Sequence, residues 1–380
     1  MRTEALIDLS AITDNVALLK ARTSAELMAV VKADGYGHGL AQSAEAAVRG
    51  GASWLGTAKP QEALALRRAG FTEPALAWLW TPADAETTKE AVAAGVDISV
   101  SSRWQLEVVR EAASATGHPT RVHLKIDTGL SRNGAYVGDW PDLISAVAKA
   151  QASSEVEVVG VWSHFAYADE PGNPTIAKQI AAFHEAVDVA RRAGVEPQLR
   201  HIANSAATLT LPEAHLDLVR PGIAIYGLSP VPSDGGLGEL ATRAGKNWGL
   251  RPAMTLRAGL ALTKRVAAGE GVSYGHTYHT AVETNLALVP LGYADGIPRN
   301  ASNLGPISIG GRRFTISGRI CMDQFVVDVG DLPVVAGDAA VLFGPGTDGE
   351  PTAQDWADAT GTIHYEIVTR VGVRVPRTYV

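Results

Sequence analysis

The sequence predicts an α/β protein with an N-terminal (β/α)8 barrel of the TIM type and a mainly β C-terminal domain. Two observations predict the barrel: from Leu27 to Gly222 short β-branched runs alternate with longer helical segments, and eight such runs occur. The second domain is predicted because strand-like runs with turns dominate after Tyr226. We place the two domains at residues 1–235 and 236–380. The extreme N-terminal residues could instead pack with the second domain.

The expected strands are residues 28–33, 53–58, 75–80, 96–101, 121–127, 158–165, 199–204 and 216–222. The segments between them are rich in Ala, Glu and Arg with helical periodicity, as in residues 60–69 and 176–193. A cluster of Pro, Ser and Gly in residues 229–240 is typical of a connector. Beyond it we expect one helix, residues 352–360, capped by Thr352 and ended by Gly361.

The composition is that of an ordinary globular protein, with 46% hydrophobic, 19% charged and 6% aromatic residues. Lys and Arg total 33 against 40 Asp and Glu, so no basic surplus favours a nucleic-acid partner. The first residues lack the pattern of a secretory signal, nothing resembles a membrane segment, and no metal site is expected. The single cysteine, Cys321, favours a cytoplasmic protein, and we expect it to be a buried structural thiol.

Polar residues close several of the expected strands, where TIM barrels carry their active sites. They are Lys32, Lys125, Asp127, His164, Asn204, Ser205 and Arg220. Two Lys, one His and one Arg on one rim favour a bound anion or an electrophile. Lys32 follows an apolar run and precedes a glycine-rich turn, where a partly desolvated amine can attack an aldehyde. A lone lysine at a loop start is more often simply solvated, so the surrounding motifs decide.

Motifs along nearly the whole chain occur in the order found in one enzyme family. They are AVVKADGYGHG (29–39), LKIDTGLSR (124–132), SHFAYADE (163–170), HIANSAAT (201–208), VRPGIAIYG (219–227), VSYGHTY (272–278), GYADGIPR (292–299), GRICMDQ (318–324) and HYEIVTRVG (364–372). On these motifs the chain resembles the alanine racemases, fold type III enzymes that depend on pyridoxal 5'-phosphate (PLP). The resemblance implies interconversion of L-alanine and D-alanine, which supplies D-alanine for peptidoglycan. It also implies a head-to-tail homodimer in which the β domain of each chain completes the other's site.

The resemblance assigns the two bases that racemisation requires, one for each face of Cα. Lys32 would carry PLP as a Schiff base, and Tyr274 from the other subunit would face it across the cofactor plane. His164 and Arg220 would help Tyr274 to ionise, and Arg220 would also bond the pyridine nitrogen. The further PLP contacts implied by the resemblance are Tyr36, Arg132, His164, Asn204, Ser205, Gly222, Ile223 and Tyr365.

Substrate contacts are assigned in the same way. The resemblance implies that Arg132, the backbone amide of Met322 and nearby Asp323 bind the substrate. In many relatives the lysine matching Lys125 is carbamylated and orients the arginine, whereas the residues equally allow an unmodified Lys125 paired with Asp127. The implied channel gate comprises Asp169, Tyr274, Tyr293 and Tyr365, with Arg299, Arg319 and Ile363 farther out.

The chain departs from the usual family pattern at four positions. Leu130 and Ser131 stand where relatives often carry Met and Gly, Ile297 stands where an aromatic residue or Leu is frequent, and His364 replaces a usual Pro. We expect Ser131 to affect the setting of Arg132 and Ile297 to affect the channel entrance. His364 is expected to be a strand neighbour that points away from Tyr365.

Other functions remain possible on the residues alone. A racemase of broader specificity that accepts serine and a PLP-dependent decarboxylase would share the fold, but the decarboxylase motifs are not evident. A cofactor-free Schiff-base aldolase would not need Tyr274 or a second domain. A PLP-binding homeostasis protein resembles the barrel alone, so the β domain argues against it.

Overall fold

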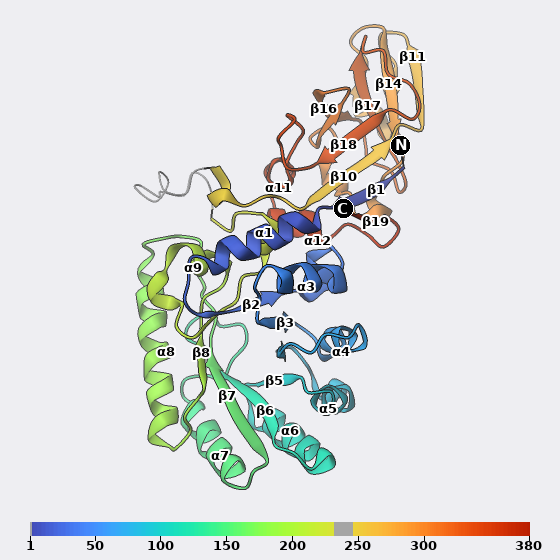
Figure 1. Ribbon diagram of the computed structural model, residues 1–380. Coiled ribbons are helices and arrows are strands. Elements are labelled where there is room, and N and C mark those ends of the chain that lie inside the picture. Colours follow the sequence, from blue (N-terminus) through green and yellow to red (C-terminus); the bar gives the residue numbers. More distant parts are fainter. Residues whose placement is uncertain (1, 232–245) are drawn as a thin grey trace. The chain divides into compact units, whose positions relative to one another are not determined.

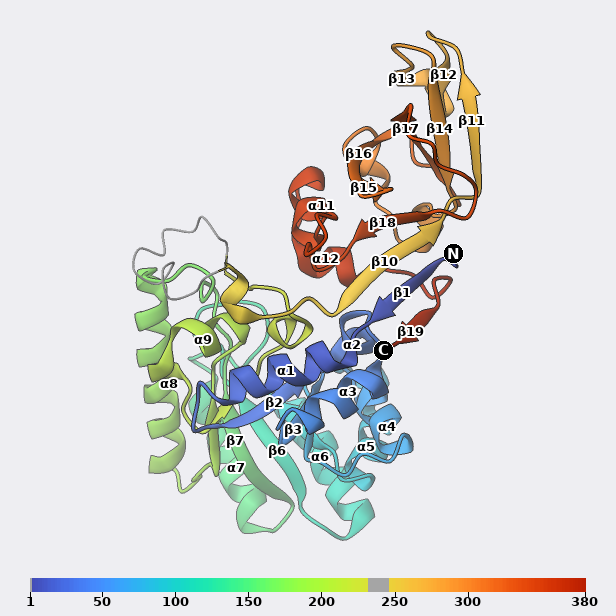
Figure 2. The ribbon, with the colours of Figure 1, turned by 45° about the horizontal axis from the view of Figure 1, so that its top comes forward.

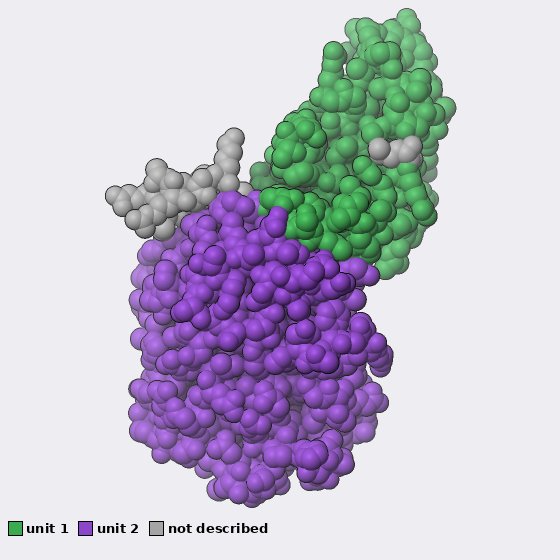
Figure 3. Space-filling model, in the orientation of Figure 1, with its two compact units in different colours: residues 1–11, 36–39, 251–380 green, residues 12–35, 40–250 purple. Residues whose placement is uncertain are grey.

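The structure is a computed structural model that describes residues 2–231 and 246–380. The chain divides into two compact units, drawn in different colours in Figure 3. The β unit comprises Met1–Ala11, Tyr36–Gly39 and Arg251–Val380, and the barrel unit comprises Ile12–Gly35 and Leu40–Leu250. The domain boundary expected at residues 235 and 236 lies outside the described residues.

Eight parallel strands form the barrel sheet. They are β2 (Glu26–Val30), β3 (Trp54–Thr57), β4 (Ala75–Ala77), β5 (Asp97–Val100), β6 (Thr120–Lys125), β7 (Val156–Trp162), β8 (Leu199–His201) and β9 (Leu218–Val219). Their order is β8-β7-β6-β5-β4-β3-β2-β9. The edge strands β8 and β9 are linked by backbone hydrogen bonds from Asp217 N to Arg200 O (3.2 Å) and from Arg220 N to Ala203 O (2.9 Å), so the barrel is nearly closed. Each predicted run overlaps one strand, which confirms the barrel.

Helices alternate with these strands and lie outside them (Figures 1 and 2). They are α3 (Leu40–Arg49), α4 (Pro60–Arg68), α5 (Ala85–Ala93), α6 (Arg103–Thr116), α7 (Trp140–Ala152), α8 (Pro174–Arg192) and α9 (Ser205–Thr210), preceded by α1 (Leu9–Lys20). The two predicted helices at residues 60–69 and 176–193 correspond to α4 and α8. α8 starts where Asn173 accepts a hydrogen bond from Thr175 N and Pro174 occupies the first turn. Its buried residues recur at helical spacing, for example Ile176, Phe183 and Val187.

The β unit is built on a nine-stranded sheet of order β11-β14-β17-β16-β15-β18-β10-β1-β19. Its strands are β1 (Glu4–Ile7), β10 (Met254–Gly259), β11 (Leu262–Val266), β14 (Thr284–Val289), β15 (Pro306–Ile309), β16 (Arg312–Ser317), β17 (Phe325–Gly330), β18 (Ala339–Phe343) and β19 (Arg377–Tyr379). A separate hairpin joins β12 (Gly271–Val272) to β13 (Tyr278–His279). β1 pairs antiparallel with β10 and parallel with β19, so the extreme N-terminal residues belong to this sheet.

The predicted C-terminal helix is present as α11 (Ala353–Thr360). Thr352 Oγ1 accepts from Asp355 N (3.1 Å), Asp355 Oδ2 accepts from Thr352 N (2.8 Å), and Gly361 ends the helix with a φ of +67°. The strand expected around His364 is wrong, because a second short helix, α12 (His364–Thr369), follows. Its buried residues His364, Ile367 and Val368 lie at i, i+3 and i+4, which is helical spacing.

Candidate active site

Lys32 follows β2 at the C-terminal end of the barrel and opens an unusual turn. Ala33, Asp34, Gly35 and Tyr36 have φ values of +53°, +54°, +61° and +52°, so the segment α2 (Lys32–Tyr36) is left-handed. This conformation costs roughly 1–2 kcal/mol for each residue with a side chain. A Cβ at position 35 would lie 2.6 Å from Ser43 Oγ, so glycine is required there. Such strain persists only where the surrounding structure holds it, and it concentrates at functional sites.

The Lys32 side chain is half-buried. Burial lowers the pKa of Lys32 below its usual value, the Arg132 charge lowers it further, and Glu62 opposes both effects. The Lys32 ammonium also lies 5.9 Å from the centroid of the Trp78 ring. A lowered pKa increases the fraction of neutral amine, which is the form that attacks a carbonyl carbon.

Lys125 closes β6 and is buried, with its Nζ 4.2 Å from the Trp162 ring centroid. Burial and the charges of Arg220 and Arg132 lower the pKa of Lys125 to about 7. The Asp127 charge opposes this lowering, so the choice between a carbamylated Lys125 and an unmodified Lys125 paired with Asp127 stays a prediction. With a pKa of about 7, the Lys125 amine is present in both its charged and its neutral form near neutral pH.

Asp127 instead shapes the loop that carries Arg132. Its Oδ1 accepts the backbone amides of Gly129, Leu130 and Ser131 at 2.9, 3.0 and 3.1 Å. Ser131 adopts a φ of +55°, a conformation that favours the glycine often found there in relatives. Arg132 follows Ser131 directly and is exposed. The loop conformation set by Asp127 therefore fixes the backbone position from which the Arg132 side chain extends.

Arg220 lies directly after β9 and is buried. It donates to Ser163 O (2.7 Å), His164 Nδ1 (3.3 Å) and His201 Nδ1 (3.1 Å). Burial lowers the pKa of Arg220 to about 9, still above neutral, so the guanidinium keeps its charge and only donates. Burial and the charge of Arg220 hold the pKa of His164 well below its usual value. His164 is thus neutral, and because Nδ1 accepts, its proton is on Nε2.

A series of buried, hydrogen-bonded polar side chains continues from Arg220 through the barrel. His201 Nε2 lies 2.9 Å from His123 Nδ1, and His123 Nε2 lies 3.1 Å from Asp97 Oδ2. Since Arg220 only donates, His201 must donate from Nε2 to His123, which in turn donates to Asp97. Burial would raise the pKa of Asp97, but the hydrogen bonds from His123 and Arg121 hold it below its usual value.

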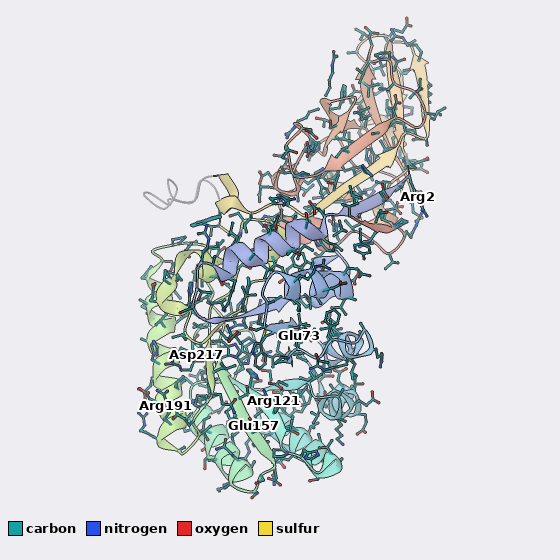
Figure 4. All side chains as sticks on the ribbon, viewed as in Figure 1. Arg2, Glu73, Arg121, Glu157, Arg191 and Asp217 are labelled. Carbon is teal, nitrogen blue, oxygen red and sulfur yellow. The ribbon has the colours of Figure 1, made fainter. Side chains whose placement is uncertain are left out.

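This series of hydrogen-bonded side chains was not predicted, although the sequence contains a signal for it. Polar residues occupy alternate positions in two buried strands, with Asp97 and Ser99 on β5 and with Arg121, His123 and Lys125 on β6. Alternate residues of a strand share one face, so these side chains line one surface of the sheet. Figure 4 labels Arg121 and Glu157, which bridge β6 to β7 at the start of both strands.

The loops after β8 and β9 form a cradle of hydroxyl and amide groups. Ser205 Oγ accepts from Gly222 N (2.8 Å) and from Ala224 N (3.4 Å). Asn204 caps α9 by accepting from Ala207 N (3.0 Å), and Ile223 opens η3 (Ile223–Tyr226). The structure therefore brings together Asn204, Ser205, Gly222 and Ile223, at the place where TIM barrels commonly bind phosphate.

Tyr274 lies at the tip of the β12–β13 hairpin in the β unit. It opens η5 (Tyr274–His276), and 71% of its surface is exposed. The preceding Ser273 has a φ of +62° and donates from Oγ to Arg319 O (2.6 Å), which joins the hairpin to the loop before β17. Cys321, expected to be buried, is only half-buried, with its Sγ 3.5 Å from Ser273 Oγ.

The loop after β14 and the loop before β17 are also joined in the β unit. Tyr293 N donates to Cys321 O (3.1 Å), and Ala294 N donates to Met322 O (2.9 Å). Met322 is 54% exposed, and the neighbouring Asp323 accepts from Arg374 (2.7 Å). Other predicted gate residues of this unit are exposed, namely Tyr293, Arg299, Arg319 and Ile363, while Asp169 is exposed in the loop after β7 of the barrel unit. Ile297 is buried, and its effect on the channel entrance stays a prediction.

Two tyrosines predicted to bind the cofactor meet in the β unit. The ring centroids of Tyr36 and Tyr365 lie 6.4 Å apart. Burial raises the pKa of Tyr36, so its hydroxyl stays protonated and able to donate. His364 packs on Tyr365 with ring centroids 5.0 Å apart and does not point away from it, which corrects the expected orientation. Burial lowers the pKa of His364 to about 4, so it is neutral, and its Nδ1 lies 2.7 Å from Gln354 Oε1.

Comparisons with known proteins identify the family. The model of the alanine racemase N-terminal domain matches residues 7–230, and that of the alanine racemase C-terminal domain matches residues 253–379. The chain belongs to the alanine racemase family. An alanine racemase of Salinispora tropica is 60% identical over 379 residues, which cover 100% of this chain and 98% of the relative. The comparisons confirm the predicted family and the predicted class of enzyme, an amino acid racemase.

Solved alanine racemases share the fold. The alanine racemase of the D-cycloserine producer Streptomyces lavendulae superposes with a TM-score of 0.94 at 55% identity, covering 100% of this chain and 97% of that one. That of Streptomyces coelicolor A3(2) has a TM-score of 0.94 at 56% identity, covering 100% and 98%. Within residues 2–231 and 246–380, no helix has the length and apolar character needed to cross a membrane.

Proposed function

We propose that the protein is a PLP-dependent alanine racemase that interconverts L-alanine and D-alanine. One observation carries the proposal: an amine with a lowered pKa, Lys32, shares the C-terminal end of the barrel with the charged donor Arg220 and the Ser205 cradle. These donors match the three polar parts of PLP, which are an aldehyde, a pyridine nitrogen and a phosphate. Bound PLP would supply the conjugated ring that accepts the electron pair released at Cα.

Each part of PLP has protein groups suited to it. Lys32 would bind the aldehyde carbon, and Arg220 would donate to the pyridine nitrogen. Because Arg220 keeps its proton, that nitrogen would stay unprotonated, which would disfavour side reactions such as transamination. The phosphate contacts that we propose are the hydroxyls of Tyr36, Ser205 and Tyr365 and the amides of Gly222 and Ile223, with Asn204 and His164 beside the cofactor.

Racemisation requires a proton to leave one face of Cα and another to arrive at the opposite face. We propose that Lys32 and Tyr274 are the two bases, with neutral His164 and charged Arg220 favouring an ionised phenol. The high exposure of Tyr274 and Met322 supports a head-to-tail homodimer in which these residues serve the other chain's site. Each chain would then receive Tyr274, Met322 and Asp323 from its partner.

The substrate carboxylate is an anion and needs donors. We propose that Arg132 and the backbone amide of Met322 donate to the carboxylate. Asp323 lies next to Met322 and accepts a hydrogen bond from Arg374. Asp169, Tyr293, Arg299, Arg319 and Ile363 are the proposed gate. We propose that serine is a poor alternative substrate that is not fully rejected, because a pocket discriminates only modestly against one extra group.

We further propose that Lys125 is carbamylated and that the carbamate orients Arg132. A neutral amine is needed to attack carbon dioxide, and the pKa of about 7 leaves Lys125 largely neutral above that pH. With 13C-labelled bicarbonate, the carbamate carbon signal of the protein is expected to be strong well above pH 7. It should decline as the pH falls through 7 and be missing in Lys125→Arg. A signal that Lys125→Arg retains would place the carbamate elsewhere.

The test of function is Cα hydrogen exchange in heavy water. With PLP present, the protein is expected to convert either alanine enantiomer to a mixture of both, with deuterium at Cα of the product. Chiral chromatography gives the conversion and mass spectrometry gives the label. A PLP-binding homeostasis protein would bind PLP without exchange, a decarboxylase would release carbon dioxide, and equal rates on serine would indicate broader specificity.

The proposed setting is the cytoplasm of a cell that builds peptidoglycan. The one cysteine of the chain is a free thiol, Cys321, which suits a reducing compartment. D-Alanine from this reaction would supply the cell-wall precursors.

A further inference from the structure

We propose that Glu62 is a positioning residue for Lys32, because its carboxylate holds the left-handed turn that presents the amine. Glu62 lies in the first turn of α4, on the strand–helix connection next to the one that carries Lys32. This role of Glu62 concerns the position of the Lys32 amine. It rests on the proposed function only in taking PLP as the ligand that this amine binds.

Three backbone amides converge on the Glu62 carboxylate. Oε1 accepts from Ala33 N (2.7 Å), and Oε2 accepts from Ala58 N (2.9 Å) and Lys59 N (3.0 Å). One carboxylate thus joins the peptide directly after Lys32 to the turn between β3 and α4. Glu62 is itself fixed by its place in α4, where it caps the N-terminal amide of the helix.

The turn needs such a brace because its conformation is intrinsically unfavourable. Ala33 and Asp34 are exposed and carry side chains, yet both adopt left-handed backbone angles. Farther along, Gly35 N donates to Val31 O (2.8 Å) and Leu40 N donates to Asp34 Oδ1 (2.8 Å). Glu62 acts at the other end of the turn, on the peptide next to Lys32, and does so with a full charge, which strengthens each hydrogen bond.

Glutamine has the shape of glutamate but cannot replace it here. An amide offers one oxygen and one NH2 group, whereas both Glu62 oxygens accept from backbone donors. Glu62→Gln must therefore set an NH2 group against either Ala33 N or the amides of Ala58 and Lys59. The substitution also removes a negative charge that raises the pKa of Lys32. Glu62→Asp keeps the negative charge but shortens the side chain. Comparing the two substitutions therefore separates the effect of geometry from the effect of charge.

The experiment compares full-length wild type, Glu62→Gln and Glu62→Asp, with Glu45→Gln at an exposed position of α3 as a control for the charge change. Without PLP, backbone hydrogen exchange at Ala33 should be slow in wild type and at least tenfold faster in both Glu62 variants. PLP should dissociate about tenfold more readily from both, because binding must then order the turn. The pH at which the Lys32 amine titrates should fall in Glu62→Gln alone, a change that a purely structural role would not cause.

The inference would be overturned by fast exchange of the Ala33 amide in wild type, or by Glu62 variants that match wild type in exchange and PLP affinity. Fast exchange in wild type would overturn the inference even if a variant failed to fold, and after slow exchange the variant that folds supplies the comparison. If wild type bound no PLP at Lys32, the proposed function would fail, while the exchange data would still test the brace.

Discussion

Lys32→Ala is expected to abolish racemisation in both directions, together with the covalent attachment of PLP. The substitution removes the nucleophilic amine and one of the two proposed bases. A positioned base typically contributes about 10²- to 10⁴-fold to such a reaction, and loss of the cofactor attachment adds to that. The visible absorbance of bound PLP should disappear, and borohydride reduction followed by mass spectrometry should no longer label the peptide containing Lys32.

The control is Lys178→Ala, on the exposed surface of α8, which should leave PLP labelling and racemisation unchanged. Attachment of PLP to another lysine in wild type, with normal racemisation by Lys32→Ala, would remove Lys32 from the site.

Tyr274→Phe is expected to keep PLP bound while racemisation falls by about 10²- to 10⁴-fold. Phenylalanine retains the ring but has no hydroxyl, so one face of Cα loses its base. Tyr278→Phe is a matched control in the same hairpin, because the Tyr278 hydroxyl donates to Asp328 Oδ2 (2.8 Å) and is assigned no part in the reaction. The control should lower thermal stability slightly and leave the racemisation rate near that of wild type.

Subunit mixing tests the proposal that Tyr274 serves the other chain. A mixture of Lys32→Ala and Tyr274→Phe should regain activity, because a hybrid dimer contains one site with both bases intact. Mass spectrometry under native conditions would establish that subunits exchange. Proven exchange without any recovery of activity would contradict the shared site.

The barrel was predictable because each of its strands is a short apolar run between helical segments. The sheet of the β unit was predictable only in kind, since β1 pairs with β10 and β19 from the far end of the chain. Such pairings leave no local pattern in the sequence. The helix α12 was missed because it has only six residues, too few for a clear helical period.

The candidate site divides in the same way. Lys32, Arg220 and Ser205 were predictable because they close strands of a barrel, and family motifs assigned Tyr274. Glu62 was missed because its partners are backbone amides, which no side-chain motif records. The sequence allowed both a carbamylated Lys125 and an unmodified Lys125 paired with Asp127, and it did not show that Asp127 Oδ1 accepts the amides of its own loop.

The central claim is that Lys32 and Tyr274 act on opposite faces of one carbon atom. The most direct measurement is Cα deuterium uptake from heavy water by Tyr274→Phe, with each alanine enantiomer supplied separately. Lys32 alone should exchange the hydrogen of one enantiomer without inverting it and leave the other nearly unlabelled. Equal labelling of both enantiomers, with inversion at the wild-type rate, would contradict the claim.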